Sequence, residues 1–280
     1  MQIVRTKQEM ESLVQNLLLK QKSIGFVPTM GYLHEGHLSL ISAAKKENNV
    51  VICSIFVNPT QFNNPEDYKL YPRNEERDFK MLEENTCDIV FAPGPELVGD
   101  IKQVSLNLNG IDTVMEGKFR PGHFQGVINI VSLFFQIVKP TSAYFGQKDF
   151  QQLAIVQQLA KANFPSLNIV PIPTKREENG LAMSSRNARL SEEEKIKALQ
   201  ISAALFFIKE ASKDIKDCSV LKKTAIEKFF SNGDLELEYL EISNAETLET
   251  LVHLSKVKAV VCIAAFCGKV RLIDNIVINY

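Results

Sequence analysis

Residues 23–44, SIGFVPTMGYLHEGHLSLISAA, combine a short apolar run, a glycine-containing turn and the start of an amphipathic helix. The run SIGFV predicts a short buried strand that is closed by Pro28. After the turn, Leu38, Ile41 and Ala44 recur at the spacing of one helix face. A strand that leads at once into a helix is the building unit of α/β proteins.

Strands and helices also alternate along the residues that follow. The run VVICSIFV at 50–57 is continuously apolar and rich in β-branched residues, which is typical of a strand buried on both faces. Further strands are predicted at DIVFAP, SAYFG and NIVPIP, with helices around Phe79 and Leu82 and from Asp149 onward. The prolines and asparagines of NPTQFNNPEDYKLYP predict a loop. The alternation favours an α/β fold with a doubly wound parallel sheet.

The pattern changes near Pro173, where the polar segment TKREENG begins. A helix is predicted after Ser191, followed by two alternating strands around 236–242 and 258–266 and the segment KVRLIDNIVI. We therefore expect a Rossmann-like domain over residues 1–175 and a smaller α+β domain over residues 176–280.

Composition restricts the class of protein. The 280 residues carry a formal net charge of −1, which gives no electrostatic reason to expect nucleic acid or an anionic membrane as a partner. The longest apolar run, 127–138, is too short to span a bilayer, and the N-terminal stretch MQIVRTKQEMESL lacks the apolar segment of a secretory signal. Five cysteines without Cys-x-x-Cys spacing favour a reducing compartment, so we expect a cytoplasmic protein.

His34 and His37 lie three residues apart in the turn before the predicted helix. A zinc site is disfavoured, because metalloprotease helices space their histidines at i and i+4 and no third ligand is evident. The pair can instead bind phosphate, since a helix N-terminus after a strand presents unpaired N–H groups, and Gly31 and Gly36 allow close approach. The pair alone favours a third interpretation, in which His34 caps the helix and His37 packs on its first turn.

Other segments add groups that suit a nucleotide. YFGQKDFQQ at 144–152 places Lys148 and Asp149 at a second strand-to-helix turn, and GLAMSSRN at 180–187 places two hydroxyls and Arg186 in a loop between the domains. Such a loop suits closure over a triphosphate. NPTQF offers the neutral amide of Gln61, and EGKFRPGHFQG adds Arg120 and His123 in a Gly/Pro-rich loop. Together these groups indicate a nucleotide-transferring site, although P-loop and Gly-x-Gly-x-x-Gly motifs are absent from the sequence.

Six stretches resemble the pantoate–β-alanine ligase family in order and spacing: VPTMGYLHEGHLSLI, SIFVNPTQFNNPEDYKLYPR, VMEGKFRPGHFQGV, AYFGQKDFQQL, NGLAMSSRN and RLIDNI. The resemblance implies an ATP-dependent ligase that condenses (R)-pantoate with β-alanine to pantothenate. The expected intermediate is an enzyme-bound pantoyl adenylate, and the expected by-products are pyrophosphate and AMP. The resemblance also implies a homodimer, and Mg²⁺ held mainly through ATP phosphates without a dedicated protein ligand.

The resemblance assigns catalysis to His34, His37, Lys148 and Arg186. The residues it assigns to ATP are Met30, Gly31, Tyr32, Leu33, His34, Glu35, Gly36, His37, Gly146, Gln147, Lys148, Asp149, Lys175, Met183, Ser184, Ser185 and Arg186. It assigns pantoate and β-alanine to Gln61 and Gln152. Tyr32 and Lys175 depart from the residues usual in the family, but neither change removes a catalytic group.

Four other interpretations remain at this stage: a nucleotidyltransferase with another acid or CTP, a non-catalytic nucleotide-binding descendant, a metal hydrolase and an RNA-binding protein. Another nucleotidyltransferase would have no reason to keep both Gln61 and Gln152. A non-catalytic descendant would be expected to have lost one of the catalytic groups. RNA binding is disfavoured because the sequence shows no basic patch.

Overall fold

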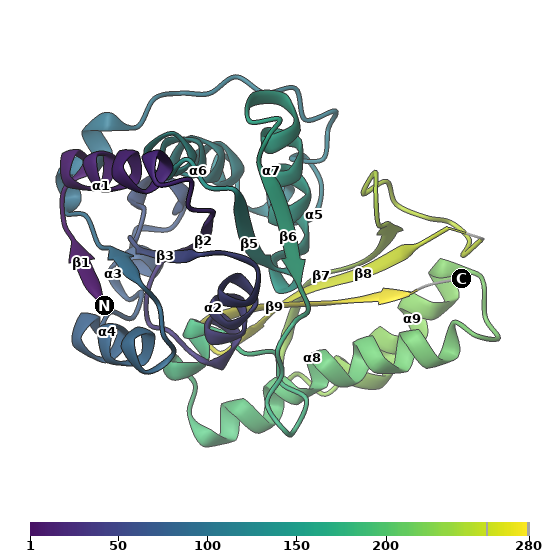
Figure 1. Ribbon diagram of the computed structural model, residues 1–280. Coiled ribbons are helices and arrows are strands. Elements are labelled where there is room, and N and C mark those ends of the chain that lie inside the picture. The colour runs from purple at the N-terminus through teal and green to yellow at the C-terminus, as the bar shows by residue number, and fades with distance from the viewer. Residues whose placement is uncertain (256, 279–280) are drawn as a thin grey trace. The chain divides into compact units, whose positions relative to one another are not determined.

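Figure 1 shows the computed structural model, which describes residues 1–255 and 257–278. The chain forms two compact units. The first contains Met1–Asn109, Arg120–Gln147 and Gln152–Pro173. The second contains the described residues from Thr174 onward, together with two short segments from earlier in the chain, Gly110–Phe119 and Lys148–Gln151.

The first unit is built on a six-stranded sheet in the order β1-β4-β3-β2-β5-β6. The strands are β1 Gln2–Val4, β2 Ile24–Thr29, β3 Val50–Ile55, β4 Ile89–Phe91, β5 Ser142–Gly146 and β6 Asn168–Ile172. Every neighbouring pair is parallel. The predicted doubly wound parallel sheet is therefore confirmed. The strand order reverses at β2, which pairs with β3 on one side and with β5 on the other.

Helices connect these strands. They are α1 Lys7–Leu19, α2 Glu35–Glu47, α3 Pro65–Lys69, α4 Glu75–Glu84, α6 His123–Val138 and α7 Phe150–Asn163, with the 3₁₀ turns η1 Pro59–Gln61, η2 Pro95–Asp100 and η3 Gln147–Asp149. None of the helices in the described residues is long and apolar enough to cross a membrane.

Alternation along β2 places its side chains in two apolar layers. Phe26 packs edge-to-face on Phe134 and Phe135 of α6, at ring-centroid distances of 5.9 and 6.5 Å. The next residue, Val27, belongs to the cluster that contains Ile41 and Ala44 of α2. Successive residues of a strand point to opposite faces, so α6 covers one face and α2 the other, with α1 beside α6 (Figure 1).

Two local predictions were wrong. β2 continues through Pro28 to Thr29, and the proline is tolerated because the ladder with β5 joins Gly25 and Phe26, earlier in the strand. The predicted loop contains the helical turns η1 and α3. Each begins at an Asn-Pro pair, in which Asn caps the turn and Pro occupies a first-turn position where no backbone N–H is needed.

The second unit packs two helices on an antiparallel sheet. The order is β7-β8-β9, with β7 Glu236–Asn244, β8 Ala259–Cys267 and β9 Val270–Ile278. Its helices are α5 Met115–Phe119, α8 Glu192–Ala211 and α9 Cys218–Phe229, with the 3₁₀ turn η4 Ser185–Arg189. Ser191 caps α8 through a capping box with Glu194, as the prediction of a helix after Ser191 requires. All five cysteines of the chain are buried free thiols.

A buried ionic network joins α5 to this sheet. Arg271 of β9 donates to both carboxylate oxygens of Glu116 at 2.7 and 2.8 Å and also bonds Glu238 of β7. Tyr239 donates its hydroxyl to Glu116 at 2.8 Å, and burial together with this carboxylate raises the pKa of Tyr239. The guanidinium thus balances the buried Glu116 carboxylate and the half-buried Glu238 carboxylate.

Arg271→Ala should lower the free energy of unfolding by about 3–5 kcal/mol, because it leaves buried carboxylates without their counter-charge. Lys223→Ala is the matched control: its ion pair with Glu227 is exposed, so its removal should cost less than about 1 kcal/mol. Urea unfolding followed by circular dichroism measures both. Equal losses in the two variants would contradict the structural role given to Arg271.

Candidate active site

The first unit brings two predicted site segments to neighbouring strand ends. β2 leads through Met30–Leu33 into α2, and β5 leads into η3. β2 and β5 are hydrogen-bonded neighbours at the point where the strand order reverses. In open α/β sheets, ligands bind outside the carboxyl ends of the strands at such a point. His34 and His37 therefore follow one of the two strand ends at which a ligand is expected, and Gly146 is the last residue of the other strand.

The turn after β2 has an unusual backbone. Gly31 and Tyr32 both have positive φ, at 76° and 49°. The Gly31 N–H donates to the Thr29 hydroxyl at 3.1 Å, and that hydroxyl donates to the Ser54 carbonyl at 2.6 Å. A non-glycine residue with positive φ is uncommon, so Tyr32 needs other contacts to hold its backbone.

Asp78 of α4 supplies those contacts. Its two carboxylate oxygens accept the backbone N–H groups of Tyr32 and Leu33, each at 2.7 Å. The side chain is 1% exposed, and burial raises its pKa against the opposing effect of the two hydrogen bonds. A Cβ on Gly31 would lie 3.0 Å from an Asp78 oxygen and 2.9 Å from Ile55, so glycine is required here for space as well as for φ.

The two histidines cap α2 with their own ring nitrogens. Nδ1 of His34 accepts the Gly36 N–H at 3.1 Å, and Nδ1 of His37 accepts the His34 N–H at 3.3 Å. The capping interpretation is thus confirmed. Since Nδ1 is the acceptor in both rings, each neutral ring carries its proton on Nε2. The rings lie 4.1 Å apart between centroids at the N-terminus of α2.

Among the residues that the structure describes, no three His, Cys, Asp or Glu side chains gather as a set able to hold a metal ion.

Gln61 is held in η1 by a network that the sequence did not reveal. Its side-chain Nε2 lies 3.0 Å from the Met30 sulfur, and Asn58 donates to its Oε1 at 3.2 Å. Arg120 can only donate, so His123 Nε2 accepts from it at 3.2 Å and the Nδ1–H of His123 donates to the Gln61 carbonyl at 2.8 Å. The RPGHF stretch was noted for its charges, but its link to Gln61 spans 62 residues.

Gly126 of α6 allows η1 to lie against the helix. A Cβ at this position would come within 2.5 Å of the Thr60 carbonyl oxygen and 2.8 Å of the Gln61 Cα. Asn58 donates to the Gly126 carbonyl at 3.1 Å across the same contact. Gly126 thus also helps to fix the position of Gln61. The sequence analysis gave Gly126 no role.

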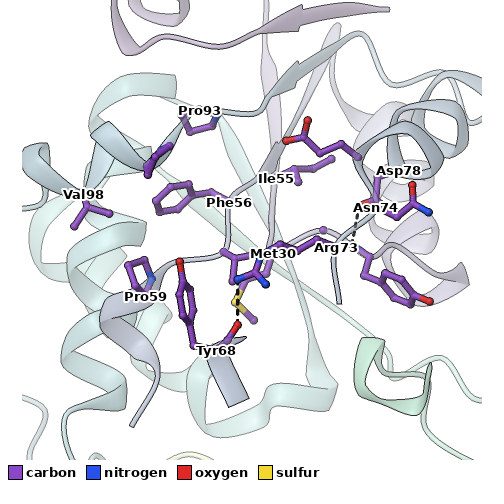
Figure 2. Close-up of a pocket in the computed structure, with 15 residues that line it drawn as sticks. Met30, Ile55, Phe56, Pro59, Tyr68, Arg73, Asn74, Asp78, Pro93 and Val98 are labelled. Carbon is purple, nitrogen blue, oxygen red and sulfur yellow. Dashed lines mark hydrogen bonds between the residues drawn. The ribbon is translucent and has the colours of Figure 1, made fainter. Parts of the chain in front are cut away.

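A cavity of about 210 Å³ lies against the turn in the first unit (Figure 2). Figure 2 shows Phe56, Pro93 and Val98 on one side and Asn74 and Asp78 on the other. Its lining includes Met30, Gly31 and Tyr32 but neither histidine. The two oxygens of Asp78 are used by the turn. The cavity therefore lies beside Asp78 and the turn that it holds, and not beside the rings of His34 and His37.

Seven further predicted site residues belong to the second unit, namely Lys148, Asp149, Lys175, Met183, Ser184, Ser185 and Arg186, whereas Gln147 and Gln152 belong to the first. Lys148 Nζ lies 3.6 Å from the Asp149 carboxylate. The Met183 N–H donates to the Lys175 carbonyl at 3.0 Å, which brings these two predicted residues together. Ser184 caps η4 by accepting the Arg186 N–H at 3.3 Å, and Ser185 is buried.

The last two glutamines of FGQKDFQQ differ in environment. Gln151 is buried and bonds the Ile111 and Val114 carbonyls and the Glu116 N–H, so it has a structural role in the second unit. Gln152 is half-buried and belongs to the first unit. Only Gln152 therefore keeps its side chain outside this structural network.

Comparisons with known proteins agree with these motifs. The family model for pantoate–β-alanine ligase matches residues 2–277. The chain is a member of the pantoate–β-alanine ligase family. A pantothenate synthetase from Caldicellulosiruptor bescii is 47% identical over 282 residues, which cover 100% of this chain and 99% of that protein. The crystal structure of pantothenate synthetase from Thermus thermophilus has a TM-score of 0.92 and 39% identity, with 99% of both chains covered.

A third relative was solved with ligands. Pantoate–β-alanine ligase from Francisella tularensis, complexed with beta-gamma ATP and β-alanine, has a TM-score of 0.80 and 37% identity, with 99% of this chain and 97% of that chain covered. As a pantoate–β-alanine ligase, the present chain is an ATP-dependent enzyme of pantothenate biosynthesis.

Asp78→Asn should lower kcat/KM about 10- to 100-fold, because an amide NH₂ would face one of the two backbone N–H donors and shift the turn before the histidines. Asp88→Asn is the matched control: its carboxylate accepts the Val51 N–H at 2.7 Å, at the start of β3. Steady-state kinetics compare the two. An unchanged kcat/KM in the Asp78 variant would show that the turn does not need this anchor.

The same residue predicts opposite pH effects on activity and stability. The folded pKa of Asp78 is raised, so its contribution to the free energy of unfolding increases as pH falls through that pKa. Protonation also removes the charge that strengthens both N–H bonds, so activity should fall over the same pH interval. Asp78→Asn should lack both responses in pH-dependent kinetics and urea unfolding.

Proposed function

We propose that the chain performs its ligation in two steps. A carboxylate oxygen of (R)-pantoate attacks the α-phosphorus of ATP, forming pantoyl adenylate as the bond to the β-phosphate breaks and pyrophosphate leaves. The free amine of β-alanine then attacks the acyl carbon, loses its proton, and forms the amide of pantothenate as AMP leaves. The observation that carries this proposal is the pair of histidine rings at the N-terminus of α2, each held through its Nδ1 by a backbone N–H.

His34 and His37 stabilise the charge that develops during adenylation. Negative charge accumulates on the α-phosphate and on the leaving pyrophosphate, and preorganised donors in a fixed orientation lower the barrier most. The Nδ1 atoms are used in capping, so both rings hold their orientation and direct Nε2–H away from the helix backbone. The N-terminal dipole of α2 adds to the same effect. We assign His37 the further role of proton donor to the leaving group.

The remaining ATP contacts follow the resemblance. Lys148 and Arg186 bind phosphate oxygens together with Ser184 and Ser185. Gly146, Gln147 and Asp149 contact the nucleotide sugar. Lys175 and Met183 contact the base through their backbone, whose geometry is fixed by the hydrogen bond between them. The residues around His34 complete the set: Met30, Gly31, Tyr32, Leu33, Glu35 and Gly36.

Gln61 and Gln152 bind pantoate. Two neutral amides suit a small acid with hydroxyl groups, because they orient it without lowering the nucleophilicity of its carboxylate through a full positive charge. The hydrogen bonds from Asn58 and His123 hold both the side chain and the carbonyl of Gln61. β-Alanine uses the same region in the second step, after adenylation.

Mg²⁺ is bound through ATP phosphates and water. This ion keeps several waters and binds substrate phosphates, so we assign it no dedicated protein ligand. When bound, it neutralises phosphate charge. Closure of the second domain over the site, the homodimer and the cytoplasmic location stay predictions of the sequence analysis.

AMP release with ATP and Mg²⁺ tests the reaction, with pantoate and β-alanine omitted in turn. We expect release only when both are present, matched by formation of pantothenate, because the adenylate stays bound until the amine arrives. Release with pantoate that does not depend on β-alanine would contradict the proposed acceptor. The absence of release in every mixture would support a non-catalytic nucleotide-binding protein.

His37→Ala should reduce pantoate-dependent pyrophosphate release about 10²- to 10³-fold, the usual cost of losing one donor to a developing anion. His253→Ala is the matched control, since His253 is an exposed histidine of the second unit. Single-turnover kinetics measure the chemical step directly. Near-normal rates in the His37 variant would refute its assigned role.

A further inference from the structure

The segment RLIDNI near the end of the chain has no role in the reaction described above, although it is one of the family-like stretches. In the structure it lies in β9, and the side chains of Asp274 and Asn275 are buried at 3% and 5% exposure. Buried polar side chains require hydrogen-bond partners. The partners of these two residues lie in segments that the proposed function assigns to ATP.

Asn275 holds the backbone of Lys148. Its Nδ2 donates to the Lys148 carbonyl at 2.7 Å. Its own N–H donates to the Asp274 carboxylate, also at 2.7 Å, which ties the two residues together. The long Lys148 side chain has many rotamers, so a fixed backbone limits the region that its ammonium group reaches.

Asp274 holds Arg176 in a two-pronged ion pair. The terminal nitrogens of Arg176 donate to its two oxygens at 2.6 and 2.9 Å. The same nitrogens donate to the Gly180 carbonyl at 3.1 Å and to the Asn275 carbonyl at 3.2 Å, and the guanidinium lies over the Phe206 ring. Only the planar fork of arginine can serve these acceptors at once.

Arg176 thereby shapes the turn that carries other predicted ATP contacts. Arg176 pairs with Ala182 as a β-bridge, and the Met183 N–H donates to the Lys175 carbonyl. The bond from Arg176 to Gly180 closes the loop between these two ends. The turn at 175–183 leads directly into Ser184 and η4.

We propose that Asp274 and Asn275 are positioning residues for ATP, acting on Lys148 through Asn275 and on the turn at 175–183 through Arg176. The proposal rests on the assignment of these segments to ATP in the proposed function. A buried ion pair is weak evidence for stability by itself, because apolar residues of similar volume often do as well. The polar network instead fixes the positions of two backbone segments, Lys148 and the turn at 175–183.

A double-mutant cycle tests the link between Asn275 and Lys148. Asn275→Ala, Lys148→Ala and the double variant are compared in pantoate-dependent pyrophosphate release under single-turnover conditions. We expect Asn275→Ala to reduce the rate at least about tenfold, because small displacements of a positioned group are costly. In the Lys148→Ala background the same change should cost much less, because the positioned group is already gone.

Equal losses in both backgrounds would overturn the proposal, because a structural role costs the same with or without Lys148. Ser212→Ala is the matched control: it removes a buried side-chain donor to the Lys209 carbonyl in the same unit, and it should leave the rate unchanged. If Lys148→Ala alone has no effect, the proposed function has misassigned Lys148. If Lys148→Ala reduces the rate and the cycle is additive, only the present inference fails.

Arg176→Lys tests the second arm and does not depend on Asn275 variants folding. Lysine keeps the positive charge beside Asp274 but cannot donate to the Gly180 and Asn275 carbonyls in the same geometry. We expect the KM for ATP to rise at least about tenfold while the KM for pantoate stays unchanged. A parallel change in both KM values, or in neither, would overturn the role given to this arm.

Discussion

The carboxylate of Asp78 is the constraint on which the first unit's site depends. It is buried, which is unfavourable for a charge, and the cost is offset in part by two short bonds to the consecutive N–H groups of Tyr32 and Leu33. These bonds hold Tyr32 at a positive φ that a tyrosine rarely adopts. The chain can therefore leave β2, turn within a few residues and begin α2 beside the end of β5.

The capping role of His34 and His37 and their proposed role toward phosphate depend on different nitrogens. A histidine used only as a cap could be replaced by serine or aspartate, which are better caps. Imidazole differs from these residues because a second nitrogen remains on the opposite side of the ring. Since the cap occupies Nδ1, it also selects the Nε2–H tautomer. The capping contacts at the N-terminus of α2 thus determine both the tautomer and the orientation of the two rings.

Most of the regular structure could be predicted because it depends on local pattern. Continuous apolar runs such as 50–57 and helical spacing after Gly36 predicted the strands and helices that the structure contains. The Asn-Pro pairs were misinterpreted because the same residues begin a turn or cap a helix. Asp78 could not be found, since its contacts span 45 and 46 residues and it is one of several charged residues in its helix. The assignment of Gln152 depended on family resemblance, whereas Lys148 was already indicated by its place at a strand-to-helix turn.

In the second unit, polar side chains of strand β9 likewise hold segments that are distant in the sequence. Arg271 and Asn275 share a face of β9, where they hold the two segments inserted from earlier in the chain, through Glu116 and the Lys148 carbonyl. Asp274 holds Arg176. Apolar packing alone defines such attachments weakly, because many side chains of similar size fit one another. The directional hydrogen bonds of β9 specify which segment packs at which residue. That requirement accounts for the ionic and amide side chains in this strand.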